Sequence, residues 1–213
     1  MNLDSENEHP VRKPSDRRQR KREEKRLSIM AAAERVFHAG DVTNTSMEEI
    51  AREADVAAGT LYNYFSGKEA LFMAVFERKL SEVFSDATAQ WTSDTPFKDR
   101  LGKIIRLHLG FIHDHKGFYE YLLSLGQPDY TQPGTFSVII DLCESHLERQ
   151  TAAFKAAQDK GEISEALPPQ FLSRAMRSLC WGMASDAVNR RKTHDLNTQV
   201  EPILQLFWKG ITP

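Results

Sequence analysis

The sequence predicts an all-α protein, in which an N-terminal helix-turn-helix domain of three helices is joined by a long helix to a C-terminal helical domain. Apolar residues recur at the spacing of an amphipathic helix through most of the chain. No run alternates between apolar and polar residues as a half-buried strand would. Two Ser-x-x-Glu capping boxes, at Ser46 and Ser66, mark the starts of helices.

The composition is that of a globular protein. The 213 residues are 40% hydrophobic and can bury one core or two small ones. The formal net charge of -2 argues against a uniformly basic coat, so any affinity for DNA must come from a local basic patch. We find neither an apolar stretch of membrane-spanning length nor a signal-peptide core, and we therefore expect a cytoplasmic protein without membrane contact.

Residues 1–22 are expected to form a disordered basic arm, because they combine Pro10 and Pro14 with mixed charges and few apolar groups. A run of charges of this kind is often only a solvated tail. Next to a DNA-binding motif it would instead follow phosphates or enter a minor groove. The basic residues of this arm and of the helix start that follows are Arg17, Arg18, Arg20, Lys21, Arg22, Lys25 and Arg26.

The first helix is predicted over residues 24–39, where Ile29, Ala33 and Phe37 form an apolar stripe and Gly40 ends the helix. A second helix is predicted over residues 46–53, because Ser46 and Glu49 form a capping box. A short connection follows, and residues 58–65 then form a third helix. Helix, tight turn and helix over residues 46–65 predict a helix-turn-helix, whose second helix enters the DNA major groove.

The most informative stretch is residues 58–72. Leu61 and Phe65, four residues apart, share a buried face, while hydroxyl and amide side chains cover the opposite face. The second capping box then starts the next helix with Lys68 in its first turn, where a cation opposes the helix dipole by up to roughly 1 kcal/mol. A bound phosphate would remove this conflict, and a solvated lysine that tolerates the dipole is the equal alternative.

Residues 27–76 resemble the DNA-binding domain of the TetR family of bacterial transcriptional repressors. The signature of that family, I-A followed by G-T-L-Y-x-Y-F-x-x-K-E-x-L, is matched here by residues 50–51 and 59–71. The resemblance implies a TetR-type DNA-binding domain over residues 23–83, and an effector-binding and dimerisation domain over residues 84–213. The expected DNA contacts are Thr45, Ser46, Ala57, Ala58, Gly59, Thr60, Tyr62, Asn63, Tyr64 and Lys68.

One departure from the family pattern concerns base readout. Where the family usually has G-V-S-x-G, residues 55–59 read D-V-A-A-G. Ala57 and Ala58 have no hydrogen-bonding side chain, although an alanine can still contact a thymine methyl group. The resemblance implies a ligand-responsive repressor that binds a palindromic operator as a homodimer and is released by a small molecule. The alternative is a helical interaction protein whose DNA binding is degenerate and non-specific.

The rest of the chain is predicted to be helical. The helix that starts at Ser66 extends to about Trp91, and Pro96 starts the next one, which carries apolar residues as far as Ile112. Further helices are predicted over residues 118–125, 136–154, 169–190 and 200–211. The last two carry more apolar surface than one neighbour would cover. Packing within one chain is one explanation.

The resemblance suggests instead that the last two helices pair with those of a second subunit. Residues expected at this interface are Met176, Leu179, Met183, Ala187, Val200, Ile203, Leu204 and Phe207. An effector pocket is likewise implied by the resemblance alone, with plain core as the alternative for each residue. Expected lining residues, which suit a hydrophobic or aromatic effector, are Phe84, Trp91, Ile105, His108, Phe111, Tyr119, Leu122, Phe136 and Ile140.

An enzyme is not expected. The chain has no nucleophile in a recognisable setting and no glycine loop that cradles phosphate. His108, His113 and His115 lie on different sides of one helix, so they do not converge on a metal ion. We predict no metal and no cofactor, and we expect the two cysteines, Cys143 and Cys180, to be buried thiols.

Overall fold

The computed structural model describes residues 16–39, 42–125, 137–189 and 195–212. Every regular element within these residues is helical, and no strand occurs among them, so the all-α prediction is confirmed. The elements are α1 (Asp16–Ala39), α2 (Met47–Glu53), α3 (Ala58–Tyr62), α4 (Lys68–Trp91), α5 (Phe97–Asp114), α6 (Lys116–Ser124), α7 (Ser137–Asp159), α8 (Pro169–Asn189), the 3-10 helix η1 (Leu196–Gln199) and α9 (Val200–Ile211).

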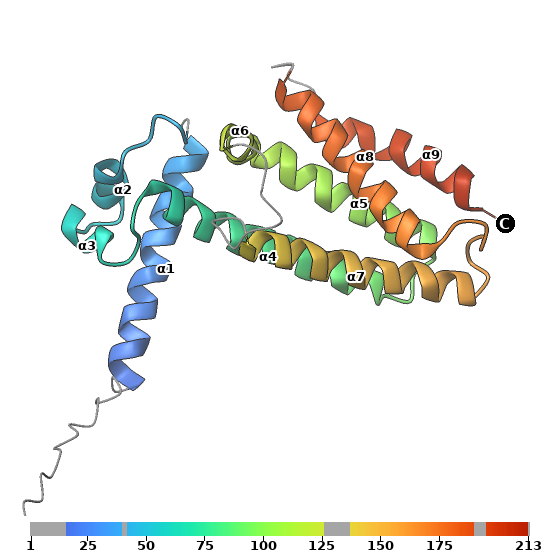
Figure 1. Ribbon diagram of the computed structural model, residues 1–213, viewed down its shortest axis with the longest axis horizontal. Coiled ribbons are helices and arrows are strands. Elements are labelled where there is room, and N and C mark those ends of the chain that lie inside the picture. The colour runs from blue at the N-terminus through green and yellow to red at the C-terminus, as the bar shows by residue number, and fades with distance from the viewer. Residues whose placement is uncertain (1–15, 40–41, 126–136, 190–194, 213) are drawn as a thin grey trace, which may run out of the picture.

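Helices α1, α2 and α3 pack with the first turns of α4 at one end of the molecule (Figure 1). Each helix contributes an apolar side chain to a shared core, because helical spacing collects such residues on one face. Ile29, Phe37, Ile50, Leu61 and Leu71 are at most 1% exposed. Full burial of a side chain of this size contributes about 1.5–3 kcal/mol. This core fixes the orientation of the short helix α3.

Helix α1 begins at Asp16, well before the predicted start near residue 24. Residues 16–24 are all exposed, so tertiary packing does not hold this part of the helix. Arginine, lysine, glutamine and glutamate are good helix formers, and Glu23 pairs with Arg26 at 3.6 Å one turn along. The prediction of a disordered arm is therefore wrong for residues 16–22, while residues 1–15 lie outside the described part of the chain.

The start of α4 also differs from the prediction. Its N-cap is Gly67, and no side chain caps the helix. The helix begins one residue later than a capping box at Ser66 and Glu69 requires, because that box needs Ser66 itself as the N-cap. The second predicted capping box is therefore absent. Downstream, α4 runs out of the N-terminal group of helices into the larger bundle (Figure 1).

Helix α5 occupies the middle of the C-terminal bundle and contacts α4, α6, α8, η1 and α9 (Figure 1). Helix α7 packs against both α4 and α8. At the end of the bundle farthest from α1, Phe154 packs against Phe97 and Phe207, with ring centroids 5.4 and 6.0 Å apart. In the described part of the chain, no helix combines the length and the apolar character needed to cross a membrane.

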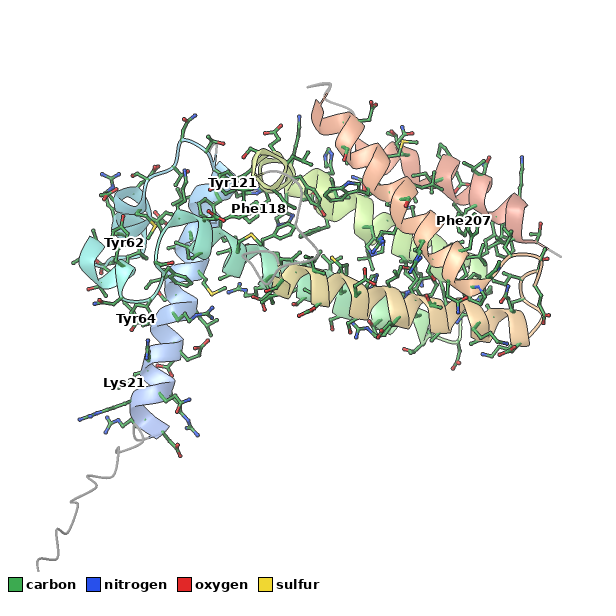
Figure 2. The ribbon with its side chains drawn as sticks, in the orientation of Figure 1. Lys21, Tyr62, Tyr64, Phe118, Tyr121 and Phe207 are labelled. Carbon is green, nitrogen blue, oxygen red and sulfur yellow. The ribbon has the colours of Figure 1, made fainter. Side chains whose placement is uncertain are left out.

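An aromatic cluster connects the N-terminal helices to the C-terminal bundle. Phe118 of α6 meets Phe37 of α1 at 5.9 Å and Phe72 of α4 at 5.4 Å between ring centroids. Tyr121 packs edge-on against Phe72 at 4.6 Å. Figure 2 shows Phe118 and Tyr121 where α6 comes close to α1 and α4. Helix α6 thus contacts the N-terminal helices directly, in addition to the continuous path along α4.

Candidate DNA interface and internal cavity

The unit formed by α2, the turn and α3 is held by local hydrogen bonds. Ser46 caps α2, because its Oγ accepts a hydrogen bond from the Glu49 backbone N–H at 3.1 Å. Asp55 has a φ of 52°, a left-handed value that reverses the chain after α2. The Val56 N–H then donates to the Ala51 carbonyl at 3.0 Å, and α3 begins at Ala58. The predicted helix-turn-helix geometry is therefore present.

Helix α3 presents polar side chains away from the core. Leu61 is fully buried and anchors the helix, whereas Tyr62 is 49% exposed and Asn63 is also exposed. Thr60 and Tyr64 are half-buried, so each still has surface available. Tyr62, Tyr64 and Lys21 lie at the end of the molecule away from the C-terminal bundle (Figure 2). Helix α3 ends at Tyr62, before the predicted residue 65, so Asn63 is its C-cap and Tyr64 follows it. Hydroxyl and amide groups on and just after such a helix suit contacts with phosphates and base edges.

Gly59 is not needed for packing within the chain. A Cβ atom added at this exposed position would meet nothing within 4 Å. Glycine inside a helix costs about 1 kcal/mol relative to alanine. Close approach of another molecule, such as a DNA backbone, gives a reason for glycine here. The neighbouring residues Ala57, which is exposed, and Ala58, which is half-buried, flank it at the start of α3.

Lys68 has partners within the chain. Its Nζ donates a hydrogen bond to the Thr43 carbonyl at 2.6 Å and lies 5.6 Å from the centroid of the Tyr121 ring. A phosphate is therefore not required to explain a lysine at this helix start, although an ammonium group has three donors and can add one. Thr45 is only 7% exposed, so its side chain offers little surface for the predicted DNA contact.

The first turns of α1 form a basic helical arm, defined here as residues 16–26. It carries seven basic residues and three acidic ones. Most of them are exposed, while the Arg26 guanidinium lies 5.4 Å from the Phe65 ring centroid and joins the arm to the core beside α3. The arm projects from the same end of the molecule as α3 (Figure 1). The arm itself forms a local positive surface beside the helix-turn-helix, on a chain of net charge -2.

An internal cavity of about 370 Å³ lies in the C-terminal bundle. Side chains from α4, α5, α6, α7 and α8 line it. The structure brings together the expected lining residues Phe84, His108, Phe111, Tyr119, Leu122 and Ile140. A mainly apolar cavity of this size is typical of a site for a small molecule.

Two expected lining residues lie elsewhere. Trp91 packs against Phe97 and Phe154, with ring centroids 5.9 and 5.7 Å apart, near the far end of the bundle. Ile105 is fully buried and does not face the cavity. Both predictions are wrong for the same reason, since a stripe on a helix shows that a residue is buried but not which neighbour covers it. Phe136, a third expected residue, lies outside the described part of the chain.

Sequence reasoning missed most of the far wall, which α7 and α8 supply. His146 and Gln150 stand one turn apart on α7, and Cys180 and Trp181 come from α8. The sequence did carry a signal for this wall, because His146 and Gln150 are polar residues four apart and therefore share a helix face that is otherwise apolar. Burial raises the pKa of the Cys143 and Cys180 thiols to about 11 and about 12, so both are protonated near neutral pH.

Two histidines form the polar centre of the cavity. His108 Nε2 and His146 Nε2 are 3.2 Å apart, and the His146 ring stacks on Phe84 with centroids 3.9 Å apart and planes 6° from parallel. Burial lowers the pKa of His108 to about 4. Burial, and then the positive fields of His108 and Arg149, lower the pKa of His146 to about 3. Both rings are therefore neutral at pH 7.

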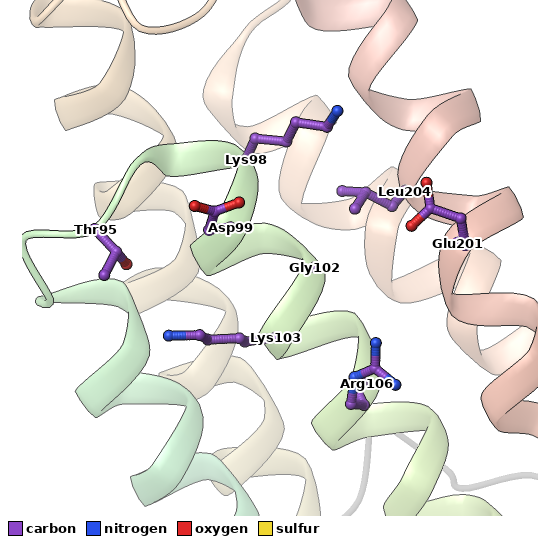
Figure 3. Close-up of a pocket in the computed structure, with 8 residues that line it drawn as sticks. All are labelled: Thr95, Lys98, Asp99, Gly102, Lys103, Arg106, Glu201 and Leu204. Carbon is purple, nitrogen blue, oxygen red and sulfur yellow. The ribbon is translucent and has the colours of Figure 1, made fainter.

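A second hollow lies between α5 and α9 and has a different character. Its volume is about 460 Å³. Figure 3 shows the residues that line it, which are Thr95, Lys98, Asp99, Gly102, Lys103, Arg106, Glu201 and Leu204. Charges of both signs line this open groove. Its polar wall suits water and ions, and it is a poorer candidate for an apolar ligand than the cavity in the bundle.

Five of the residues expected at a subunit interface instead fill the core of the chain itself: Met176, Val200, Ile203, Leu204 and Phe207, all at most 8% exposed. Leu179 and Ala187 are half-buried, and Met183 is 39% exposed. The four on α9 were misassigned because that helix turns its apolar stripe toward α5, and Met176 of α8 is covered by α7, where its sulfur lies 3.5 Å from Gln150 Nε2. The large apolar side chains that α8 and α9 do expose are Phe171, Trp181, Met183 and Leu206.

The histidines of α5 are dispersed. His115 Nδ1 lies 3.0 Å from the Phe111 carbonyl oxygen, and His113 Nδ1 lies 3.8 Å from Asp195. His108 faces the cavity. Among the described residues, no three His, Cys, Asp or Glu side chains are grouped in a way that would hold a metal ion.

Comparison with known proteins identifies relatives over most of the chain. The sequence model of a family described as "Bacterial regulatory proteins, tetR family" matches residues 29–75. The HTH-type transcriptional activator FasR of Mycolicibacterium smegmatis is 26% identical over 193 residues, which are 90% of this chain and 84% of that protein. The fatty acid metabolism regulator protein of Bacillus subtilis is 23% identical over 88% of this chain and 95% of its own length.

A solved structure shares the fold. The transcriptional regulator FadR from Bacillus subtilis, in complex with stearoyl-CoA, superimposes with a TM-score of 0.69. The alignment covers 85% of this chain and 96% of the other, at 20% sequence identity. At this identity the likeness establishes the common helical architecture.

Proposed function

Because this chain belongs to the tetR family of bacterial regulatory proteins, we propose that it is a ligand-responsive repressor acting on a palindromic operator. As a member of that family it is a DNA-binding transcriptional regulator rather than an enzyme. The observation that carries the proposal is the exposed polar face of α3 beside the basic helical arm. We place the protein in the cytoplasm, where chromosomal DNA is available to it.

The DNA half of the proposal assigns two kinds of contact. Thr60, Tyr62, Tyr64 and Lys68 hold the phosphate backbone. Asn63 and the alanines at the start of α3 meet base edges in the major groove. The basic helical arm adds phosphate contacts and long-range attraction. Because the net charge of the chain is -2, these contacts must supply the electrostatic part of the affinity.

The effector half of the proposal places a hydrophobic or aromatic small molecule in the internal cavity. The cavity volume of about 370 Å³ and its mainly apolar wall support this assignment. The likeness to regulators of fatty acid metabolism, one of them bound to stearoyl-CoA, supports an effector with an acyl chain.

The coupling between effector binding in the cavity and DNA binding by the N-terminal helices runs through α4 and α6. Phe76, Leu80 and Phe84 of α4 line the cavity, while the first turns of the same helix pack on α1. An effector that spreads this wall would tilt α4 and change the spacing of the two reading heads of a dimer. If the effector binds the DNA-incompetent state about 100-fold more tightly, it supplies about 2.7 kcal/mol of coupling.

A homodimer is proposed through α8 and α9. The apolar side chains that these helices expose, Phe171, Trp181, Met183 and Leu206, are of the kind that a second subunit covers. A two-fold dimer would place two copies of α3 one helical turn of DNA apart, which matches a palindromic operator.

Operator selection followed by a salt titration tests the function. Random double-stranded DNA is enriched on the full-length protein, and binding of enriched and scrambled duplexes is measured from about 50 to about 200 mM salt. A specific regulator keeps a large preference for the enriched sequence as salt rises. Equal affinity for both duplexes at every salt concentration would instead favour a helical interaction protein with degenerate DNA binding.

Two variants separate the proposed roles. Asn63→Ala should change the selected sequence, because Asn63 is assigned to base edges. Lys68→Ala should weaken binding to all sequences about equally and lower the salt slope by roughly one. It should also reduce thermal stability, since Lys68 bonds to the Thr43 carbonyl. The same loss of sequence preference in both variants would contradict the assignment.

A further inference from the structure

The contact between His108 and His146 is the starting point for an inference about the chemistry of the effector. His108 belongs to α5 and His146 to α7, and both line the cavity. Their Nε2 atoms are 3.2 Å apart, so one ring donates to the other. The ring planes are nearly perpendicular, at 86°. The cavity is otherwise mainly apolar, which makes this pair its principal hydrogen-bonding feature.

The His146 ring is held in one orientation. The ring stacks on Phe84 with planes 6° apart and shares a hydrogen bond with His108. The residue is only 5% exposed. Its second nitrogen, Nδ1, is buried and has no hydrogen-bond partner. Leaving a buried polar atom unpaired is unfavourable, and such atoms are rare in folded proteins. A ligand in the cavity can supply the missing partner.

The tautomers of the pair define what that partner must be. A neutral imidazole has one N–H and one lone pair. When His108 donates to His146, the Nδ1 of His146 carries the hydrogen and needs an acceptor. When His146 donates to His108, Nδ1 holds the lone pair and needs a donor. A hydroxyl group satisfies both arrangements, and a carbonyl oxygen satisfies the first.

The charges around the cavity argue against an ionised group at this position. Glu144 and Arg177 are the charged residues of the lining, and they pair with each other at 3.4 Å with both side chains about half exposed. Among the described residues of the lining, no cation is therefore left to neutralise an anion beside His146. Gln150, one turn further along α7 and 1% exposed, adds a neutral amide whose Nε2 donates only to the Met176 sulfur at 3.5 Å.

We propose that the effector carries an uncharged hydroxyl or carbonyl group on an apolar body, and that His146 Nδ1 binds this oxygen, with Gln150 beside it. This inference rests on the proposed function, because it takes the cavity as the effector site. It deepens that function by naming the group that the cavity recognises. Phe84 and His108 act as positioning residues, since they hold the His146 ring without contacting the oxygen themselves.

Calorimetric titration of the full-length protein with three probes tests the proposal. The probes are 1-octanol, 1-chlorooctane and octanoate, which share a chain and differ in the terminal group. Each is titrated into the wild type and into His146→Asn, which keeps a polar group near the Nδ1 position, and His146→Gln, which keeps one near the Nε2 position. Glu148→Gln, at an exposed position of α7 outside the cavity lining, is the control.

We expect His146→Gln to weaken 1-octanol about five- to ten-fold, the value of one hydrogen bond, and to leave 1-chlorooctane within about two-fold. His146→Asn should keep most of the affinity for 1-octanol, and Glu148→Gln should leave it unchanged. Octanoate should bind the wild type more weakly than 1-octanol. Comparing each probe with itself across variants removes differences in its own hydration.

A second measurement does not depend on the variants. Nitrogen-15 spectra of the histidine rings in the wild type should show a shift of His146 Nδ1 when 1-octanol is added and none with 1-chlorooctane. If both probes bind and neither moves this signal, or if His146→Gln weakens both equally, the inference is overturned while the cavity remains an effector site. If no probe binds the wild type, both the inference and the proposed effector site in the cavity are overturned.

Discussion

At the residue scale, Lys68 and Gly59 show whether a residue of the signature is explained by contacts within the chain or by an external partner. Lys68 has partners within the chain, because it donates to the Thr43 carbonyl and lies near the Tyr121 ring, so its position alone is no evidence for a bound phosphate. Gly59 is not explained within the chain, since the space around it is open and a helix would prefer alanine there. Among the residues of the signature, Gly59 thus gives the clearer evidence of an external partner.

Substitution Gly59→Ala is predicted to weaken DNA binding without loss of stability. Alanine should stabilise α3 by up to about 1 kcal/mol, because the added methyl group meets nothing in the chain. The same methyl group should obstruct a DNA backbone that approaches α3 closely, and we expect at least a ten-fold loss of operator affinity. Thermal unfolding and operator titration measure the two effects. Unchanged DNA affinity would show that Gly59 does not lie against the backbone.

The histidine pair predicts a dependence of stability on pH. Burial lowers the pKa of both rings, to about 4 for His108 and about 3 for His146, whereas both titrate near 6.5 in an unfolded chain. Below pH 6.5 the unfolded chain therefore takes up protons that the folded protein does not. The contribution to the free energy of unfolding is fully present above about pH 6.5 and is lost as the pH falls toward 4.

Urea unfolding at pH 7 and pH 5 measures this effect. Each histidine should contribute a slope of up to about 1.4 kcal/mol per pH unit in this window. The double variant His108→Leu, His146→Leu lacks both groups and should lose that part of the slope. Wild type and double variant with the same slope would show that the pair does not control acid stability.

At the scale of elements, the basic helical arm is the clearest departure from expectation. Its composition suggested disorder, yet residues 16–26 continue α1 as a regular helix. Helical order places Arg18 and Arg22 on one face, four residues apart. A helix also holds these cations at fixed positions relative to α3, which a disordered arm would not do. The loss of entropy on binding DNA is correspondingly smaller.

The double substitution Arg18→Gln, Arg22→Gln is predicted to reduce the salt dependence of DNA binding. If both side chains neutralise phosphates, the slope of log Kobs against log salt should fall by up to about 1.8, since each contact contributes about 0.9. The double variant Lys103→Gln, Arg106→Gln removes the same charge from the groove in Figure 3 and is the matched control. A drop of equal size in the control would mean that overall charge, not the arm, sets the slope.

The whole molecule is organised by which face of each helix finds a neighbour. Helix α9 turns most of its apolar residues inward against α5, where they stabilise the chain, and leaves the large apolar side chain of Leu206 exposed for an interface. Helix α8 both lines the cavity through Cys180 and exposes Phe171 and Met183. An effector in the cavity and a second subunit on α8 would therefore act on the same helix.

Substitution Phe171→Asp with Met183→Asp is predicted to convert the dimer to monomers. These side chains are 55% and 39% exposed in the single chain, so charges there should leave its fold intact. In a dimer the two carboxylates would be buried in an apolar contact, which is strongly unfavourable. Size-exclusion chromatography with light scattering gives the mass. Leu27→Asp, at an exposed position of α1, is the control and should remain dimeric.

Much of the fold could be predicted because short-range patterns in the sequence determine it. Period and capping residues identified the helices, and the signature over residues 59–71 identified the helix-turn-helix. The cap at Ser46 was correct, whereas the one at Ser66 was not, because α4 starts after Gly67. A one-residue shift at a helix start is decided by packing, which a local motif does not record.

By itself, the sequence determined the helical class, the position of the reading unit and the identity of the residues exposed on it, because each depends on neighbours within a few residues along the chain. Only the tertiary structure decided that Trp91 and Ile105 belong to the core, that His108 meets His146 across 38 residues, and that α9 faces inward. The physical reason is that burial on a helix with several apolar faces is shared among partners distant in sequence, so its periodicity predicts that a side chain is covered but not by what.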